Sequence, residues 1–192
     1  FPSEERAELA EFLVDLAPEG MDNVFLLTTG SESTENAFKL ARTYGISKGG
    51  KKKIGFVGFE RGFHGRTLGA QQVGGIPGQK DWIGNEDPAI VQVPFPDGYW
   101  TENVDFDLFC TTIEEKGLKP DEVCGVMLET YQGVGPDFAP VEYVRALAEW
   151  CQKHDVLLIF DEVQAGFGRT GKFWGFEHYG VVPDLLCFGK GV

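Results

Sequence analysis

Residues 156–162 read VLLIFDE, an unbroken apolar run that ends on two acidic residues. Runs of this kind, without alternating polar positions, are typical of strands buried on both faces of a sheet. The preceding residues 141–154 predict a helix, because Val144, Leu147 and Cys151 recur at the three- and four-residue spacing of one helix face. A helix that leads into a doubly buried strand favours a parallel sheet covered by helices.

The rest of the chain repeats this alternation of strand and helix. Further strands are predicted at residues 24–27, 54–59, 123–128 and 185–188. A helix is predicted over residues 34–42, and residues 74–107 are rich in Gly, Pro and Asp and are predicted to be mostly loop. With no internal repeat or linker in the sequence, the pattern predicts a single α/β domain with a mostly parallel central sheet and helices on both faces.

Composition narrows the class of partner and the compartment. The 192 residues carry a formal net charge of −13, which disfavours binding to nucleic acid or to an anionic membrane. No stretch is long and apolar enough to span a bilayer, and the first residues lack the pattern of a signal peptide, so we expect a cytoplasmic protein. The four cysteines are widely spaced, so we expect reduced, structural thiols and no metal site.

Polar residues follow several predicted strands directly. Gly30-Ser31, Glu129, Asp161 and Lys190 each come just after an apolar run. In open parallel sheets, ligands bind beyond the carboxyl ends of the strands. We therefore expect these residues to gather at one edge of the sheet and to form one site there.

Gly30 and Ser31 have the chemistry of a phosphate site. The glycine permits a tight turn, the serine offers a hydroxyl, and the helix that follows presents free amide groups and a positive dipole end. An ordinary strand-to-helix turn with Ser31 as N-cap is the alternative, and the motif alone leaves it open.

Asp161 and Lys190 each suggest a role in catalysis and each has a structural alternative. An ionised Asp161 at the end of a buried strand needs a cation or donors, and a protonated pyridine nitrogen would serve. An N-cap or a structural salt bridge would serve equally. Lys190 lies between two glycines, where partial desolvation of its stem would favour the neutral amine that forms a Schiff base. The alternative is a surface lysine in a glycine-rich loop.

Five blocks of sequence, taken in order, resemble the signature blocks of the class III aminotransferases, which depend on pyridoxal 5'-phosphate. The blocks are GSESTENA at 30–37, GFHGRT at 62–67, ETYQG at 129–133, DEVQAGFGRTG at 161–171 and FGKG at 188–191. The resemblance covers nearly the whole chain, and the fourth block followed by the lysine is highly specific. It implies the large domain of the fold-type I transferases.

The resemblance implies the main contacts of the cofactor. Gly30 and Ser31 would bind its phosphate, Phe63 would stack on its pyridine ring, and Asp161 would pair with the ring nitrogen. Lys190 would form the Schiff base with its aldehyde carbon and would later move a proton. The activity implied is transfer of an amino group from an amine or amino acid to a 2-oxo acid or aldehyde.

The same resemblance implies supporting roles for five other residues. Val163 would pack against the other face of the ring, Gln164 would lie near the ring hydroxyl, and His64 would support the site from its edge. Glu129 would lie beside cofactor and substrate. Arg66 matches an arginine that some members use for a substrate carboxylate, although a structural salt bridge is an equal alternative.

The chain departs from the usual family pattern at two positions and in length. Thr130 replaces a proline, and Val134 stands where a second glutamate would gate a carboxylate-binding arginine, so the sequence does not predict a 4-aminobutyrate or ornithine enzyme. Family members are also longer. Residues 1–192 therefore resemble part of a large domain without the small C-terminal domain or the threonine that the neighbouring subunit of a homodimer contributes. Cofactor binding and turnover by these residues alone are in question.

Two alternatives to transamination remain. An aminomutase or a decarboxylase could use the same scaffold, because the quoted residues prepare the cofactor and do not select the bond that breaks. A truncated, non-catalytic remnant could keep the fold as an interaction module. The presence of both Asp161 and Lys190 argues against the remnant, because a module that needs only its shape has little use for a buried acid and an amine.

Overall fold

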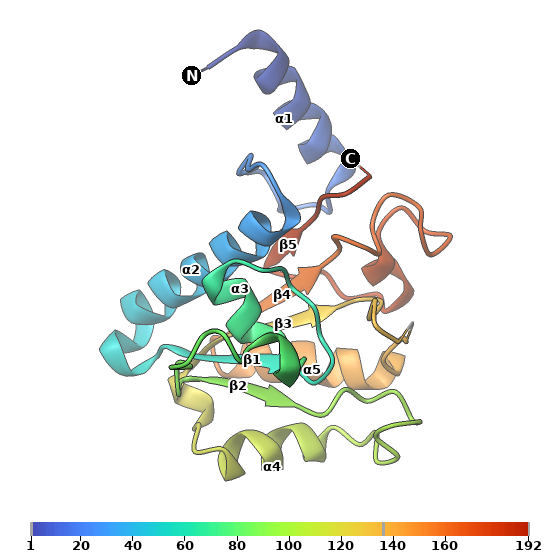
Figure 1. Ribbon diagram of the computed structural model, residues 1–192. Helices are drawn as coiled ribbons and strands as arrows, with labels where there is room; N and C mark the ends of the chain where they lie inside the picture. Colours follow the sequence, from blue (N-terminus) through green and yellow to red (C-terminus); the bar gives the residue numbers. More distant parts are fainter. Residues whose placement is uncertain (1, 136, 192) are drawn as a thin grey trace.

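The computed structural model describes residues 2–135 and 137–191, and its centre is a five-stranded sheet (Figure 1). The strand order is β2-β1-β3-β4-β5, and every neighbouring pair is parallel. The strands are β1 Gly55–Phe59, β2 Ile90–Val93, β3 Val123–Glu129, β4 Leu157–Asp161 and β5 Leu185–Cys187. The predicted parallel sheet is confirmed.

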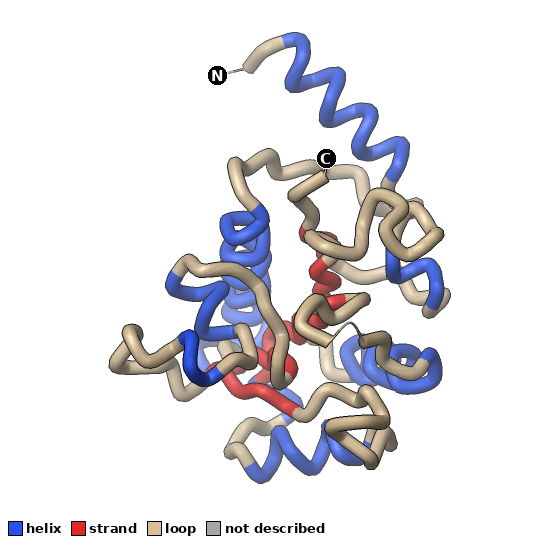
Figure 2. Tube along the Cα trace, turned by 45° about the vertical axis from the view of Figure 1, so that its right-hand side comes forward, coloured by secondary structure: helices blue, strands red, loops and turns tan. Residues whose placement is uncertain are grey.

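Two layers of helices cover the sheet, as Figure 2 shows from the side. The α-helices are α1 Glu4–Leu16, α2 Gly30–Gly49, α3 Leu68–Val73, α4 Asp107–Glu115 and α5 Val141–Lys153. Four short 3₁₀ helices lie at Gly50–Lys52 (η1), Pro77–Gln79 (η2), Pro120–Glu122 (η3) and Gly175–His178 (η4). None of the helices within the described residues could cross a membrane.

Successive residues of β3 face opposite layers, as the pleat of a strand requires. Met127 packs in the core cluster that contains Ala41 of α2, whereas Val126 and Leu128 pack in the cluster that contains Leu147 of α5. All seven residues of the strand are buried. The absence of polar positions in the apolar runs is therefore explained by helices on both faces.

Several predicted elements are confirmed, with small shifts at their ends. The helix predicted over residues 141–154 is α5, and the runs at 54–59, 123–128, 156–160 and 185–188 are β1, β3, β4 and β5. The helix predicted over residues 34–42 is the middle of the longer α2. Thr29 caps the start of α2 by accepting a hydrogen bond from the Glu32 amide at 3.1 Å.

One prediction is wrong. Residues 24–27 form no strand, because they pair with no strand among the described residues, and Phe25 and Leu27 are exposed. Residues 74–107 are mostly loop, as predicted, and they also contain the edge strand β2. The helices α1, α3 and α4 were not predicted from the sequence. The short α3 offers too few residues for a helical period.

Candidate active site

The carboxyl ends of the strands bring the predicted residues to one edge of the sheet. Glu129 at the end of β3 lies opposite Asp161 at the end of β4, and Asp161 lies opposite Cys187 in β5. Lys190 follows β5 by three residues, and Phe63 and His64 follow β1. The predicted gathering of strand-end residues is confirmed, because parallel strands all end at the same edge.

Asp161 is buried and is held by two donors. Its Oδ1 accepts a hydrogen bond from the Val163 amide at 3.0 Å, and its Oδ2 lies 2.8 Å from Nδ1 of His64. Burial alone would lower the pKa of His64, but the hydrogen bond to Asp161 and the charges of Asp161 and Glu129 outweigh burial and raise this pKa. The other ring nitrogen, Nε2, is buried without a partner among the described residues.

Glu129 joins two loops of the site. It accepts hydrogen bonds from the amide of Phe63 at 2.7 Å and from the amide of Gly133 at 3.0 Å. Burial raises the pKa of Glu129 to about 6, although the charge of His64 opposes this shift. The Phe63 ring itself is 37% exposed at this edge, where a flat ligand could stack on it.

The start of α2 lies against the segments that carry Val163 and Lys190. A Cβ atom on Gly30 would meet Val163 Cγ1 at 2.8 Å, and a Cβ atom on Gly189 would meet Gly30 Cα at 3.3 Å. Glycine permits these two close approaches without displacing a neighbour. The amides of Gly30 and Ser31 donate to no acceptor among the described residues, so the helix start can receive an anion.

Ser31 connects the helix start to the loop after Phe63. Its Oγ accepts a hydrogen bond from the Arg66 amide at 3.2 Å, and its carbonyl accepts one from Thr67 Oγ1 at 3.3 Å. Gly65 has φ of +118°, and a Cβ atom there would overlap the Ser31 side chain. The alternative in which Ser31 is the N-cap is wrong, because Thr29 fills that position.

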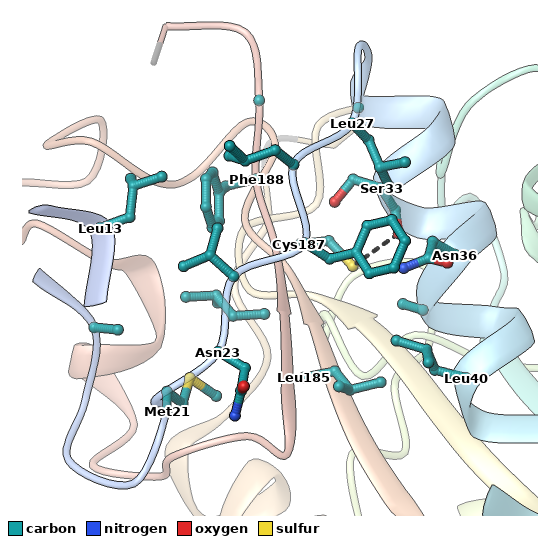
Figure 3. A pocket seen from close by; sticks show the side chains of 18 of the residues that line it. Leu13, Met21, Asn23, Leu27, Ser33, Asn36, Leu40, Leu185, Cys187 and Phe188 are labelled. Atoms are coloured by element: carbon teal, nitrogen blue, oxygen red, sulfur yellow. Dashed lines mark hydrogen bonds between the residues drawn. The ribbon is translucent and has the colours of Figure 1, made fainter. Parts of the chain in front are cut away.

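Lys190 borders the site but is exposed, with φ of +58°. It follows β5, the edge strand of the described sheet, and the partial desolvation of its stem stays a prediction. A groove of about 830 Å³ runs between residues 20–29, α2 and β5, and Gly30 and Lys190 both line it. Figure 3 shows its apolar walls, including Leu27 and Leu185.

Gln164 and Arg66 reach the same edge. Gln164 lies against the loop after β3, since a Cβ atom on Gly133 would meet its Oε1 at 2.7 Å. Arg66 is exposed and forms no salt bridge with the described residues, so the structure does not support the structural alternative for it. Val134, at the position of the family's gating glutamate, is 54% exposed.

Glu162 is a buried residue of this edge for which the sequence predicted no role. It is fully buried and accepts hydrogen bonds from Thr130 Oγ1 at 2.6 Å, the Gly175 amide at 2.7 Å and the Phe176 amide at 2.8 Å. Burial raises its pKa despite these donors. The unusual Thr130 is thus a partner of a buried acid. The acidic pair at the end of a buried strand was the available signal, but a role was predicted only for Asp161.

Comparison with known proteins gives consistent results. The family model described as "Aminotransferase class-III" matches residues 1–192. The acetylornithine/succinyldiaminopimelate aminotransferase of Photorhabdus laumondii is 39% identical over 191 residues, which are 99% of this chain and 43% of that relative. The acetylornithine aminotransferase of Methanopyrus kandleri is 38% identical over 192 residues, which are 99% of this chain and 44% of that relative.

Solved structures match in the same way. A transaminase from the marine bacterium Virgibacillus superposes with a TM-score of 0.89 at 34% identity, covering 100% of this chain and 43% of that one. A PLP-bound amine transaminase from an uncultivated Pseudomonas species superposes with a TM-score of 0.90 at 31% identity, covering 100% and 45%. The chain therefore spans less than half the length of these similar proteins.

Proposed function

The chain belongs to the class III aminotransferases, and from this membership we propose that the protein transfers an amino group with pyridoxal 5'-phosphate as its cofactor. The donor would be an amine or an amino acid, and the acceptor a 2-oxo acid or an aldehyde. One observation carries the proposal: the start of α2, Val163 and the glycine before Lys190 are in contact, although they are far apart in sequence.

The residues present fit three parts of the cofactor: its phosphate, its ring nitrogen and its aldehyde carbon. The free amides of Gly30 and Ser31 suit the phosphate, and the buried Asp161 carboxylate suits a protonated ring nitrogen. The exposed amine of Lys190 is available to the aldehyde carbon. When bound, the cofactor supplies an electron-accepting ring that allows the C–H bond beside the amino group to ionise.

Each side chain would then have a defined task. Lys190 Nζ would attach to the cofactor and, once displaced by the substrate, would move a proton between substrate and cofactor carbons. Asp161, oriented by His64, would keep the ring nitrogen charged. Phe63 and Val163 would hold the two ring faces.

Gln164, Glu129 and Arg66 complete the proposed site. Gln164 would lie at the ring hydroxyl, since it borders the loop after β3. Glu129 would lie beside cofactor and substrate at the end of its strand. The exposed guanidinium of Arg66, free of salt bridges to the described residues, suits a substrate carboxylate.

We propose that residues 1–192 form part of a PLP-binding large domain and that the protein works as a homodimer in the cytoplasm. Exposed apolar side chains on and near α1, Phe12 and Phe25 among them, support a contact with a second copy. The buried free thiols of Cys124, Cys151 and Cys187 support a reducing compartment. The net charge of −13 supports small-molecule partners rather than nucleic acid or an anionic membrane.

Covalent trapping tests the proposal. Pyridoxal phosphate is added to the purified protein, the product is reduced with borohydride, and the labelled peptide is identified by mass spectrometry. We expect the label on Lys190, its loss in Lys190→Ala, and its retention in Lys172→Ala, which removes another exposed loop lysine. A Lys190→Ala protein that still exchanged amines would contradict the proposal.

Product analysis separates the reactions that one scaffold could support. Amino transfer converts the acceptor to an amine and releases no carbon dioxide, a decarboxylase releases carbon dioxide, and an aminomutase returns an isomer of its substrate. The similar proteins named above are all aminotransferases or transaminases, which favours the first result.

A further inference from the structure

Glu129 lies where two loops of the site meet, and it contacts both through their backbones. Its Oε1 accepts from the Phe63 amide at 2.7 Å and its Oε2 from the Gly133 amide at 3.0 Å. The residue is only 6% exposed. Both carboxylate oxygens are therefore directed at this chain's own backbone.

The two loops carry different walls of the site. The first presents the Phe63 ring at the sheet edge, and the second lies against Gln164 at Gly133, where even a Cβ atom would meet Gln164 Oε1 at 2.7 Å. A further bond joins the same loops, since Gln132 Nε2 donates to the Glu60 carbonyl at 2.9 Å. Glu129 thus connects the loop that carries Phe63 with the loop that lies against Gln164.

We propose that Glu129 is a positioning residue whose carboxylate holds the Phe63 and Gly133 loops at a fixed separation and so sets the slot that the cofactor ring enters. This inference rests on the proposed function. It gives Glu129 a role different from the substrate contact that the family resemblance implies.

A carboxylate is suited to this task because it offers two equivalent acceptors to two amides. Glutamine has the same shape but only one acceptor oxygen, so Glu129→Gln must release one of the two loops. Bonds from amides to an ionised acceptor are also about twice as strong as neutral ones. The charges of the His64 imidazole and the Asp161 carboxylate act on Glu129. The charge of Lys80 in turn lowers the pKa of His64.

Amide NMR on the protein without cofactor tests the contact itself. The Phe63 and Gly133 amides should shift together with pH, with a common midpoint near the Glu129 pKa of about 6, because both donate to the same carboxylate. In Glu129→Gln both titrations should vanish. Glu60→Gln is the matched control, because it removes a carboxylate from the Phe63 loop without touching either amide, and it should leave both titrations unchanged.

Two results would contradict the proposal that both amides donate to Glu129. One is different midpoints for the two amides in the wild-type protein. The other is titration that persists in Glu129→Gln, which would assign the shifts to His64. The wild-type titration requires no variant to fold, so the inference can be tested even if Glu129→Gln proves unstable.

Cofactor affinity tests the positioning role. Glu129→Gln should bind pyridoxal phosphate about tenfold more weakly, as expected for one lost charge-assisted hydrogen bond. At saturating cofactor, Lys190 should still be labelled. Unchanged affinity would overturn the positioning role alone. A wild-type protein that is never labelled at Lys190 would overturn the proposed function and the positioning role with it, while a shared amide titration would still establish the contact.

Discussion

The pair formed by Asp161 and His64 is the most consequential contact at the scale of single residues. Both side chains are buried, and Oδ2 of Asp161 lies 2.8 Å from Nδ1 of His64. Removing one member of a buried charged pair leaves the other uncompensated, which typically costs 3–5 kcal/mol. The pair thus links the stability of the fold to the orientation of the proposed ring-nitrogen partner.

His64→Leu should therefore destabilise the protein by about 3 kcal/mol, because Asp161 keeps only the Val163 amide as a donor. Urea unfolding measures the change. His178→Leu is the control, because His178 is exposed, packs edge-on against Phe138 and forms hydrogen bonds only with Thr170 among the described residues. Equal losses in the two variants would contradict the special role of the buried pair.

The same variant makes a prediction about pH. The pKa of His64 is raised in the folded protein, so the stability from its protonated form is fully present below the unfolded value of about 6.5 and is lost as pH rises through the folded value. The difference in unfolding free energy between wild type and His64→Leu should shrink as pH increases across that window. A difference that is independent of pH, or that grows, would contradict this.

Gly30 is the second residue whose substitution has a definite expected effect. In Gly30→Ala the new Cβ would meet Val163 Cγ1 at 2.8 Å, so the Val163 side chain or the start of α2 must shift at the strand end that carries Asp161. We expect weaker binding of pyridoxal phosphate by about tenfold. Absorbance titration measures it. Gly78→Ala, where a Cβ atom meets nothing within 4 Å, should bind as the wild type does.

At the scale of elements, α2 is the helix on which the proposed phosphate site depends. Thr29 caps it by accepting from the Glu32 amide at 3.1 Å. Thr29→Ala should destabilise the protein by about 1 kcal/mol in urea unfolding, because that amide loses its partner. Thr111→Ala removes a hydroxyl that only bonds back to Asp107 within α4, so it should change stability little. Similar losses in both would show that the cap is unimportant.

The elements that were predicted correctly from the sequence are those whose apolar residues are explained by burial against the core. β3 and α5 face continuous cores, and their patterns follow directly from that burial. The run at residues 24–27 has the same apolar character, but no described strand pairs with it. An apolar run shows that burial is favoured, whereas a strand also requires a partner for its backbone.

At the scale of the whole molecule, α1 projects from the body (Figure 1). A side chain distant in sequence contacts the end of this helix. The indole nitrogen of the buried Trp174 donates to the Leu16 carbonyl at 2.9 Å. Trp174→Phe keeps an aromatic ring in the core and removes this tie. We expect faster proteolytic cleavage around residues 16–20, measured by limited proteolysis. Trp150→Phe alters the core at α5 without touching Leu16 and should show no such change.

The sequence by itself determined the parallel α/β fold and the chemical groups at the strand ends, because doubly buried strands must be apolar throughout and the polar residues that follow them stand out. Only the tertiary structure decided which groups touch. It paired His64 with Asp161 across 97 positions and Glu129 with the Phe63 amide across 66. It also placed Lys190 in an exposed position. Contacts over such separations depend on strand order and register, and no local pattern encodes them.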